Sequence, residues 1–256
     1  MRKLWLGRYV SLSSVYHSLD PRAKLLMMIL NIMMIIFITN WVQLLFAGCF
    51  IVIFLYLSKI PISFYLRQAM FLKYMYLFFL LFFSLTEGEF FLVKIGVLHL
   101  SLDGLLLGMF YVSKMILFVV MGALLTFTTT PGEIMAGVRA LFKSPSIERF
   151  AFMGNLSIRL IPTILEEVKL IYSAQKSRGL DFSELALRDK FEKLLSIIIP
   201  AISNTVKRLM MMMEAMECRG YIVGHERTSI YQLHFRVRDA VVLLCGGMAL
   251  VIIILL

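Results

Sequence analysis

The sequence predicts an all-α, polytopic membrane protein with about five transmembrane helices and a long helical region outside the bilayer. Of its 256 residues, 60% are hydrophobic, and several apolar runs reach membrane-spanning length. Residues 128–238 differ from the rest, because they hold 16 of the 26 Lys and Arg residues and no uninterrupted spanning run. We therefore divide the chain into a membrane domain of four spans (1–127), a helical region (128–238) and a final span (239–256).

The first two predicted spans form a helical hairpin. They cover about 25–39 and 41–57, and the Thr39-Asn40-Trp41 segment leaves room only for a tight turn. Asp20-Pro21 precedes the first run, which is typical of an N-cap followed by proline at the first helical position. Trp41 lies where aromatic residues are favoured, at the membrane–water interface.

The next two predicted spans are separated by a loop over 87–103. Residues 61–68 indicate a short interfacial helix, which leads into a third span at about 69–85. The fourth span, about 105–127, carries Lys114 near its middle. An ammonium at this depth usually faces the bundle interior, a partner or water. Lys114 therefore packs against a polar group or takes part in a substrate path.

Capping residues and prolines mark the starts of two helices after the fourth span. Thr130-Pro131-Gly132-Glu133 forms a capping box, and Ser144-Pro145 starts a further helix that reaches toward Leu160. The last apolar run, 240–256, follows Asp239, which we predict to cap it, and its length fits a fifth span.

Two further helices end in the same short pattern, Ala-x-x-x-Arg-Gly. Apolar residues recur at three- and four-residue steps before Ala174–Gly179 and before Ala215–Gly220. We expect Pro162 and Pro200 near the helix starts and the glycines just past the ends. From proline to arginine the helices would measure about 25 and 28 Å. We also expect them to contact each other, and the polar segment 181–193 to join them.

The repeated ending allows two interpretations. A glycine after the helix relieves a left-handed backbone, and an arginine in the last turn favours the negative end of the helix dipole. Alternatively, the small alanine permits close approach of a partner, and the arginine fork binds a carboxylate. Because the pattern occurs twice, we favour docking. The candidate docking residues are Ala174, Ser177, Arg178, Gly179, Ala215, Cys218, Arg219 and Gly220.

The enzyme class is poorly supported. Glu166-Glu167 resembles part of the Glu-Glu-x-x-x-Arg pattern of intramembrane CAAX-type proteases, but position 171 is Ile. The chain has no Gly-x-x-x-x-Gly-Lys-(Ser/Thr) phosphate loop. Its three cysteines are far apart, and its four histidines show no ligand spacing. We expect no catalytic residue, no metal site and no cofactor bound by this chain, and no nucleic-acid partner.

Basic residues predict the orientation in the membrane. The N-terminus, the 59–73 loop and residues 128–238 are rich in Lys and Arg, and all of them fall on one side if five spans alternate. This pattern places 128–238 in the cytoplasm as a helical cytoplasmic region. The C-terminus then lies outside a bacterial or archaeal cell membrane.

Two signatures make the chain resemble a known family. The runs Ala174–Phe182 and Ala215–Tyr221 are similar to the paired motifs of the transmembrane T component of energy-coupling factor (ECF) transporters. Leu19–Lys24 and Thr128–Glu133 resemble that family too, so the likeness covers nearly the whole chain. Ser177 and Cys218 replace the usual alanine before the arginine, and both are small enough to keep close packing.

The resemblance implies a scaffold that joins two ABC-type ATPases to a membrane S component for vitamin or transition-metal ion uptake. Arg178 and Arg219 would each seat in one ATPase groove, and the partner ATPases would bind ATP and Mg. Methionines near the second motif suggest sliding contacts with the S component, or else a methionine-filled helix crossing. They are Met210, Met211, Met212, Met213 and Met216.

Two rival functions stay open at this stage. A stand-alone multi-pass permease would carry its own substrate along polar intramembrane residues, for which Lys114 and Asn31 are the candidates. A membrane scaffold unrelated to ATP, carrying its own specificity, is the other. Co-purification of two nucleotide-binding subunits separates both from the ECF interpretation.

Overall fold

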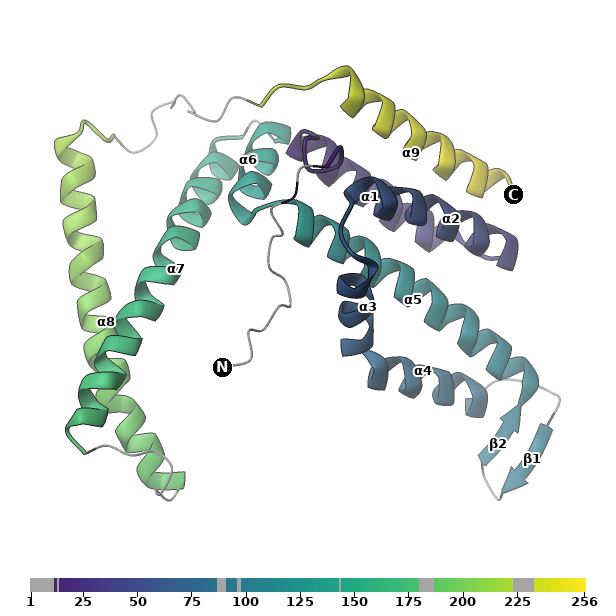
Figure 1. Cartoon of the computed structure of the whole chain (residues 1–256), viewed down its shortest axis with the longest axis horizontal. Coiled ribbons are helices and arrows are strands. Elements are labelled where there is room, and N and C mark those ends of the chain that lie inside the picture. Colours follow the sequence, from purple (N-terminus) through teal and green to yellow (C-terminus); the bar gives the residue numbers. More distant parts are fainter. Residues whose placement is uncertain are drawn as a thin grey trace. The chain divides into compact units, whose positions relative to one another are not determined.

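The chain is almost entirely helical and falls into two compact units (Figure 1). The computed structural model describes residues 12, 14–86, 91–95, 98–142, 144–179, 187–222 and 233–256. The first unit comprises residues Met1–Leu141 and Tyr231–Leu256, and the second Phe142–Ile230. This organisation confirms the predicted all-α membrane class.

The first unit contains seven helices among its described residues. They are α1 (Pro21–Phe37), α2 (Trp41–Ser58), α3 (Ile62–Phe71), α4 (Lys73–Thr86), α5 (Leu102–Thr128), α6 (Pro131–Leu141) and α9 (Val237–Leu255). The predicted caps are confirmed at two starts. Asp20 accepts a 2.9 Å hydrogen bond from the Arg22 amide, and Thr130 and Glu133 exchange the bonds of a capping box at 2.9 and 3.3 Å.

Four described helices are long and apolar enough to cross a membrane: α2, α5, α9 and residues 193–218. The pair α3 and α4 adds a fifth if it counts as one span, although it is bent by 58° at Leu72. We predicted this break near residue 69, and neither proline nor glycine marks its real position. Helix α1, with 17 residues, lies at the lower end of spanning lengths.

A short β-hairpin stands where we predicted a loop. Strands β1 (Phe91–Ile95) and β2 (Leu98–Ser101) pair antiparallel, with Ile95 opposite Leu98. Helices α4 and α5 lie on either side of the hairpin in the sequence, run antiparallel and pack along each other (Figure 1). Residues 87–90 and 96–97 of the predicted loop lie outside the described residues.

Small residues set the distance between α4 and α5. Gly104 and Gly108 are both buried and lie four residues apart on α5, and Gly108 meets α4. A Cβ on Gly108 would lie 3.2 Å from the Leu80 carbonyl oxygen, which is tighter than ordinary contact. Gly-x-x-x-Gly patterns of this kind allow close helix crossing in membranes, where apolar burial alone gives little drive.

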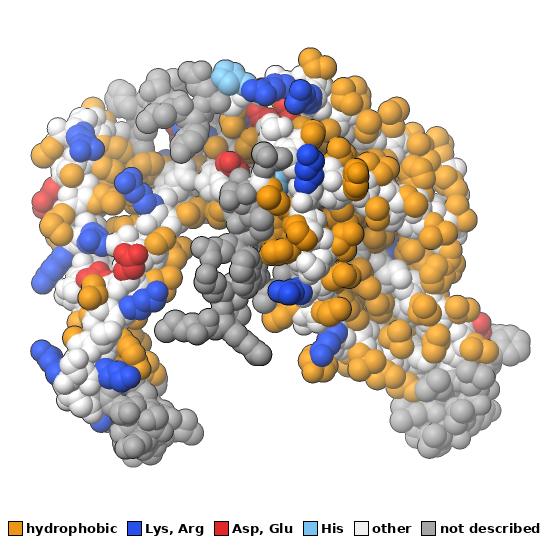
Figure 2. All heavy atoms as spheres, viewed as in Figure 1, with side chains coloured by type: hydrophobic (Ala, Val, Ile, Leu, Met, Phe, Trp, Pro, Cys, Tyr) orange, Lys and Arg blue, Asp and Glu red, His pale blue; other side chains and the backbone are white. Residues whose placement is uncertain are grey.

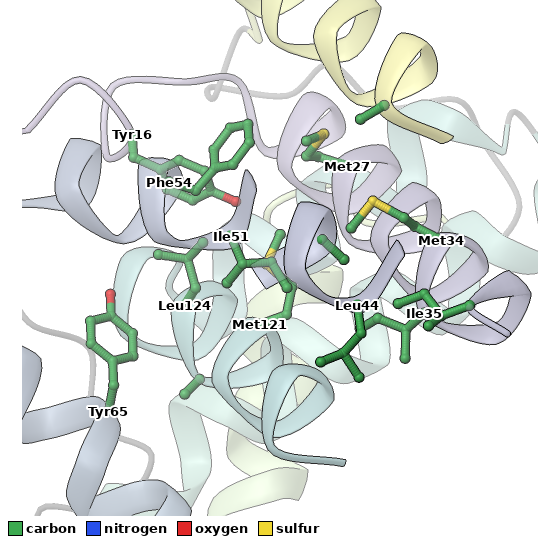
Figure 3. Packing of buried hydrophobic residues seen from close by; sticks show 14 of the residues in the cluster. Tyr16, Met27, Met34, Ile35, Leu44, Ile51, Phe54, Tyr65, Met121 and Leu124 are labelled. Atoms are coloured by element: carbon green, nitrogen blue, oxygen red, sulfur yellow. The ribbon is translucent and has the colours of Figure 1, made fainter. Parts of the chain in front are cut away.

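The core of the first unit lies between α1, α2 and α5. Figure 3 shows Met27 and Met34 of α1, Ile51 of α2 and Met121 and Leu124 of α5 within this cluster. Large hydrophobic side chains also cover much of the outer surface of this unit, whereas charges gather on the second unit (Figure 2). An apolar exterior around an apolar core is expected for helices that face lipid.

Helix α9 runs parallel to α1, and contacts at both ends fix this direction. The Asp20 amide donates to the Asp239 carboxylate at 2.9 Å, and Gln43 Nε2 donates to the Ile253 carbonyl at 3.0 Å. We predicted Asp239 as a cap before the helix, but α9 begins earlier, at Val237. Asp239 instead accepts from the Arg236 amide at 2.7 Å from within the first turn.

A buried polar cluster joins the starts of α1 and α9 to the end of α5. Lys24 is 2% exposed, and its Nζ donates to the carbonyls of His17 and Thr128, each at 3.1 Å. Asp20 and Asp239 are buried beside it. The segment between α5 and α9 therefore leaves and re-enters the bundle at the same end.

Helix α6 belongs to the first unit. It packs against α1, where a Cβ on Gly137 would lie 2.9 Å from Leu25 Cδ1. Residues 131–141 of the predicted 128–238 region thus pack with the membrane helices, and the domain boundaries that we gave stay predictions.

We expect Gly246→Val to destabilise the bundle and Gly247→Val to leave it nearly unchanged. A Cβ at Gly246 would lie 2.5 Å from Met27 Sδ, whereas one at Gly247 meets nothing within 4 Å. Overpacking of this kind costs about 1–3 kcal/mol, and both variants carry the same change in helix propensity, because each replaces a glycine by a valine. Melting temperatures of the two purified variants in one detergent test this, and equal values would contradict the close packing of α1 on α9.

Candidate functional site

The second unit consists of two long helices, α7 (Pro145–Ser177) and α8 (Leu187–Cys218). They have 33 and 32 residues, so each is about 50 Å long. We predicted Pro162 and Pro200 near helix starts and a first helix ending near Leu160, and this was wrong: both prolines lie inside continuous helices. A proline removes one backbone hydrogen bond, at a cost of about 3 kcal/mol, but the apolar pattern continues on both sides.

The two helices pack antiparallel, as their ends show. Phe152, near the start of α7, stacks on Tyr221, just beyond α8, with ring centroids 5.6 Å apart and planes at 24°. The predicted contact between the helices is confirmed. On α8 the residues least exposed recur at steps of three or four, from Ile197 and Ala201 through Thr205 and Leu209 to Met212 and Met216.

Both repeated motifs end their helices with a left-handed glycine. Gly179 has φ +87° and Gly220 has φ +77°. After α8, the Gly220 amide donates to the Glu217 carbonyl at 2.9 Å and the Tyr221 amide donates to the Met216 carbonyl at 3.0 Å. This pair of bonds is the Schellman motif, and it confirms the capping interpretation for the glycines. The Gly179 amide makes the equivalent bond to the Lys176 carbonyl at 3.1 Å.

Capping leaves the arginines available for another role. Arg178 and Arg219 are exposed, and so are the small residues beside them: Ala174, Ser177, Ala215 and Cys218. Ser177 Oγ donates to the Ser173 carbonyl at 3.1 Å, which keeps it on the helix. Within the described part of the chain, neither guanidinium has an ion-pair or hydrogen-bond partner. Leu180, Asp181 and Phe182 of the first signature lie outside the described residues.

The two arginines do not come together. Arg219 follows the end of α8 that packs near Phe152, whereas Arg178 follows the far end of α7. From Phe152 to Arg178 the helix rises about 39 Å. The sequence predicted two arginine-tipped helices but not their opposite directions, since the direction depends on how the segment between them turns.

The five methionines fall into two groups. Met212 and Met216 are half-buried on the stripe that faces α7, which is the helix-crossing role. Met210, Met211 and Met213 are exposed. Met210 and Met213 continue a second apolar stripe of exposed residues at steps of three or four, formed by Ile199, Ile202 and Val206. Met211 lies off this stripe, since each residue turns the helix by about 100°.

Residues 193–218 of α8 are long and apolar enough to cross a membrane, although we predicted no spanning run between 128 and 238. In the segments that the structure describes, neither α6 nor α7 meets the length and composition of a span. Exposed apolar residues of α8 form the stripe from Ile199 to Met213.

The polar residues that we considered for a substrate path are bonded within the bundle. Lys114 Nζ donates to the Ile38 carbonyl at 2.9 Å, which confirms packing against a polar group. Asn31 Nδ2 donates to the Met27 carbonyl of its own helix at 2.7 Å. Among the described residues the cysteines are free, and no group of three metal-binding side chains is present.

These features define a multi-pass membrane protein with a separate pair of antiparallel helices, each ending in an exposed arginine. The profile of the CbiQ family, described as cobalt transport protein, matches residues 12–230. The chain therefore belongs to the CbiQ family and is an EcfT-like T component, as the signatures predicted.

Curated relatives cover nearly the whole chain. Three of them are named energy-coupling factor transporter transmembrane protein EcfT. The protein from Streptococcus equi subsp. equi is 35% identical over 95% of this chain and 93% of its own length. That from Streptococcus thermophilus is 35% identical over 93% of both chains, and that from Bacillus subtilis is 32% identical over 95% and 94%.

We expect cysteines at Phe152 and Tyr221 to cross-link with a short bifunctional reagent, in a background from which Cys49, Cys218 and Cys245 are removed. The stacked rings place these positions close together. Cysteines at Arg178 and Arg219 should not cross-link, because they lie at opposite ends of the pair. Gel mobility after protease cleavage between α7 and α8 reports the result. A bond between positions 178 and 219 of one chain would rule out the antiparallel arrangement.

Proposed function

We propose that this chain is the coupling subunit of an ECF importer, which transmits the ATP-driven motion of two ABC-type ATPases to a substrate-binding S component. The observation that carries the proposal is the pair of exposed arginines, Arg178 and Arg219, each followed by a left-handed glycine at the end of a helix. The names of the relatives, which are energy-coupling factor transporter proteins, support it.

Each arginine end would seat in a groove of one ATPase, against an acidic side chain. The left-handed glycine stops the helix abruptly, so the guanidinium projects at a fixed tip rather than along a fraying turn. A guanidinium offers a planar fork that matches a carboxylate, and such charge-assisted bonds are worth about 1.5–3 kcal/mol. Two tips about 39 Å apart along α7 suit two separate ATPase subunits, which would bind ATP and Mg themselves.

The helix pair would carry the motion from the ATPases to the membrane. Helices α7 and α8 pack along each other, so a displacement of one tip moves the pair rather than bending one helix. The exposed stripe from Ile199 to Met213 would contact the S component, and the flexible thioethers of Met210 and Met213 would keep contact while the surfaces slide. The cargo would be a vitamin or a transition-metal ion, in line with the family description of cobalt transport.

The basic residues support a cytoplasmic position for the helix pair. Sixteen of the 26 Lys and Arg residues lie in 128–238, and segments rich in them stay on the cytoplasmic side. This orientation puts the arginine tips in the compartment where ATP is available, and the end of α9 outside.

Arg178→Ala and Arg219→Ala should each weaken ATPase binding by about tenfold or more, and the double variant should weaken it further, because each tip loses its bonds to a carboxylate. Affinity of the purified chain for the ATPases, together with uptake by reconstituted vesicles, measures this. Arg208→Ala is the matched control, since Arg208 is exposed in the middle of α8. If Arg219→Ala protein retained its ATPases and transported normally, that tip would not be a docking site.

Met210→Ser combined with Met213→Ser should reduce co-purification of the S component while ATPase binding stays unchanged. Burial of the two thioethers is lost, and each hydroxyl would need a partner in an apolar contact. Met211→Ser is the control, because Met211 is equally exposed but lies off the stripe. Equal loss in all variants would show that the stripe has no special role.

A further inference from the structure

A cavity of about 420 Å³ opens beside the turn between α1 and α2. Its wall is formed by that turn and by the first half of α5, and it lies wholly within the first unit. Aromatic and aliphatic side chains line most of it, including Trp41, Leu107, Phe110 and Tyr111. Two charged residues also line it, Lys114 and Asp103.

Lys114 presents an ammonium to this cavity with donors to spare. Its Nζ lies 2.9 Å from the Ile38 carbonyl, and the rings of Phe110 and Tyr111 lie 5.6 and 5.8 Å away. An ammonium has three N–H groups, and the carbonyl takes one. Asp103 begins the same helix, about 16 Å of rise away, and no carboxylate among the described residues pairs with the ammonium. A positive charge in an apolar wall therefore lacks an anion.

The cavity lies level with the polar turn between α1 and α2, so Lys114, although near the middle of α5, is bonded at the end of the neighbouring hairpin. Trp41 packs edge-on against Phe110, with ring centroids 5.2 Å apart, so the first half of α5 is level with the polar turn of the hairpin. Gln43 holds that turn by accepting from the amides of Thr39 and Asn40 at 2.6 and 3.0 Å. A tryptophan next to a polar turn is typical of the lipid headgroup region, where phosphates lie.

The rim of the cavity is apolar and exposed. Trp41 is 46% exposed and Leu106 is 53% exposed, and both continue the outer surface of the bundle. In a bilayer this surface contacts lipid, so whatever enters the cavity arrives from the membrane and brings an apolar part with it. A dissolved anion would have to leave water for an apolar rim.

We propose that this cavity binds the phosphate of an anionic phospholipid. The free N–H groups of Lys114 would donate to the phosphate oxygens, the Tyr111 and Trp41 rings would flank the headgroup, and an acyl chain would follow Leu106 and Leu107. Asp103 limits the affinity, because its carboxylate repels the phosphate.

Trp41 serves as the reporter for a test. The chain has two tryptophans, so Trp5→Phe leaves Trp41 as the sole tryptophan, which is excited selectively at the long-wavelength edge of its absorption. The full chain is reconstituted in vesicles that contain brominated phosphatidylglycerol or brominated phosphatidylcholine at equal mole fraction. A basic residue near an anionic lipid gives a preference of about fivefold, so we expect phosphatidylglycerol to quench Trp41 about fivefold more effectively. Equal quenching by the two lipids would overturn the proposal.

Three variants and one added anion make the result specific. Lys114→Met should remove the preference, Lys73→Met, on α4, should leave it intact, and Asp103→Asn should increase it. The increase expected for Asp103→Asn tests the proposal even if the Lys114→Met protein does not fold. A preference that survives Lys114→Met would assign it to another residue. Loss of the preference in excess inorganic phosphate would show a site for small dissolved anions and would also overturn the lipid proposal.

Discussion

The bundle depends on a buried charge, that of Lys24, and on the groups that compensate it. Its ammonium is bonded to carbonyls of the segment before α1 and of the end of α5, with Asp20 and Asp239 buried close by. A buried ion stabilises a fold only when its partners are all in place, since removal of one leaves an uncompensated charge. Three helix ends therefore have to meet at one point, and this sets the path of everything between α5 and α9.

That meeting point gives the helix pair its place in the topology. Because the chain leaves and re-enters the bundle at the same end, α7 and α8 form a separate unit between two neighbouring points of the bundle. The glycine caps finish each helix at a defined residue. The antiparallel packing then separates the two arginine tips, which the proposed docking to two ATPase subunits requires.

Local signals in the sequence predicted the parts that local chemistry determines. The caps at Asp20 and Thr130, the membrane class and the two glycine ends all follow from side chains a few residues apart.

Features that depend on distant packing were missed or misplaced. Pro162 and Pro200 lie within helices because the apolar stripe continues past them, and the bend at Leu72 has no local marker. The division of the methionines between two faces, and the cavity beside Lys114, needed the arrangement of the helices. The docking roles of Arg178 and Arg219 rest on the repeated motif and its resemblance.

The bond between Asp20 and Asp239 joins residues 219 positions apart. During synthesis α1 enters the membrane long before its partner helix exists, so the Asp20 amide stays without its final acceptor, and Met27 without Gly246, until α9 emerges from the ribosome. Helix α1 can pack on α2 and α5 before that, so only its face toward α9 waits for a partner. Completion of the bundle is in this sense a late, post-insertion event, and a chain interrupted after α8 would present an unfinished groove to quality-control proteases.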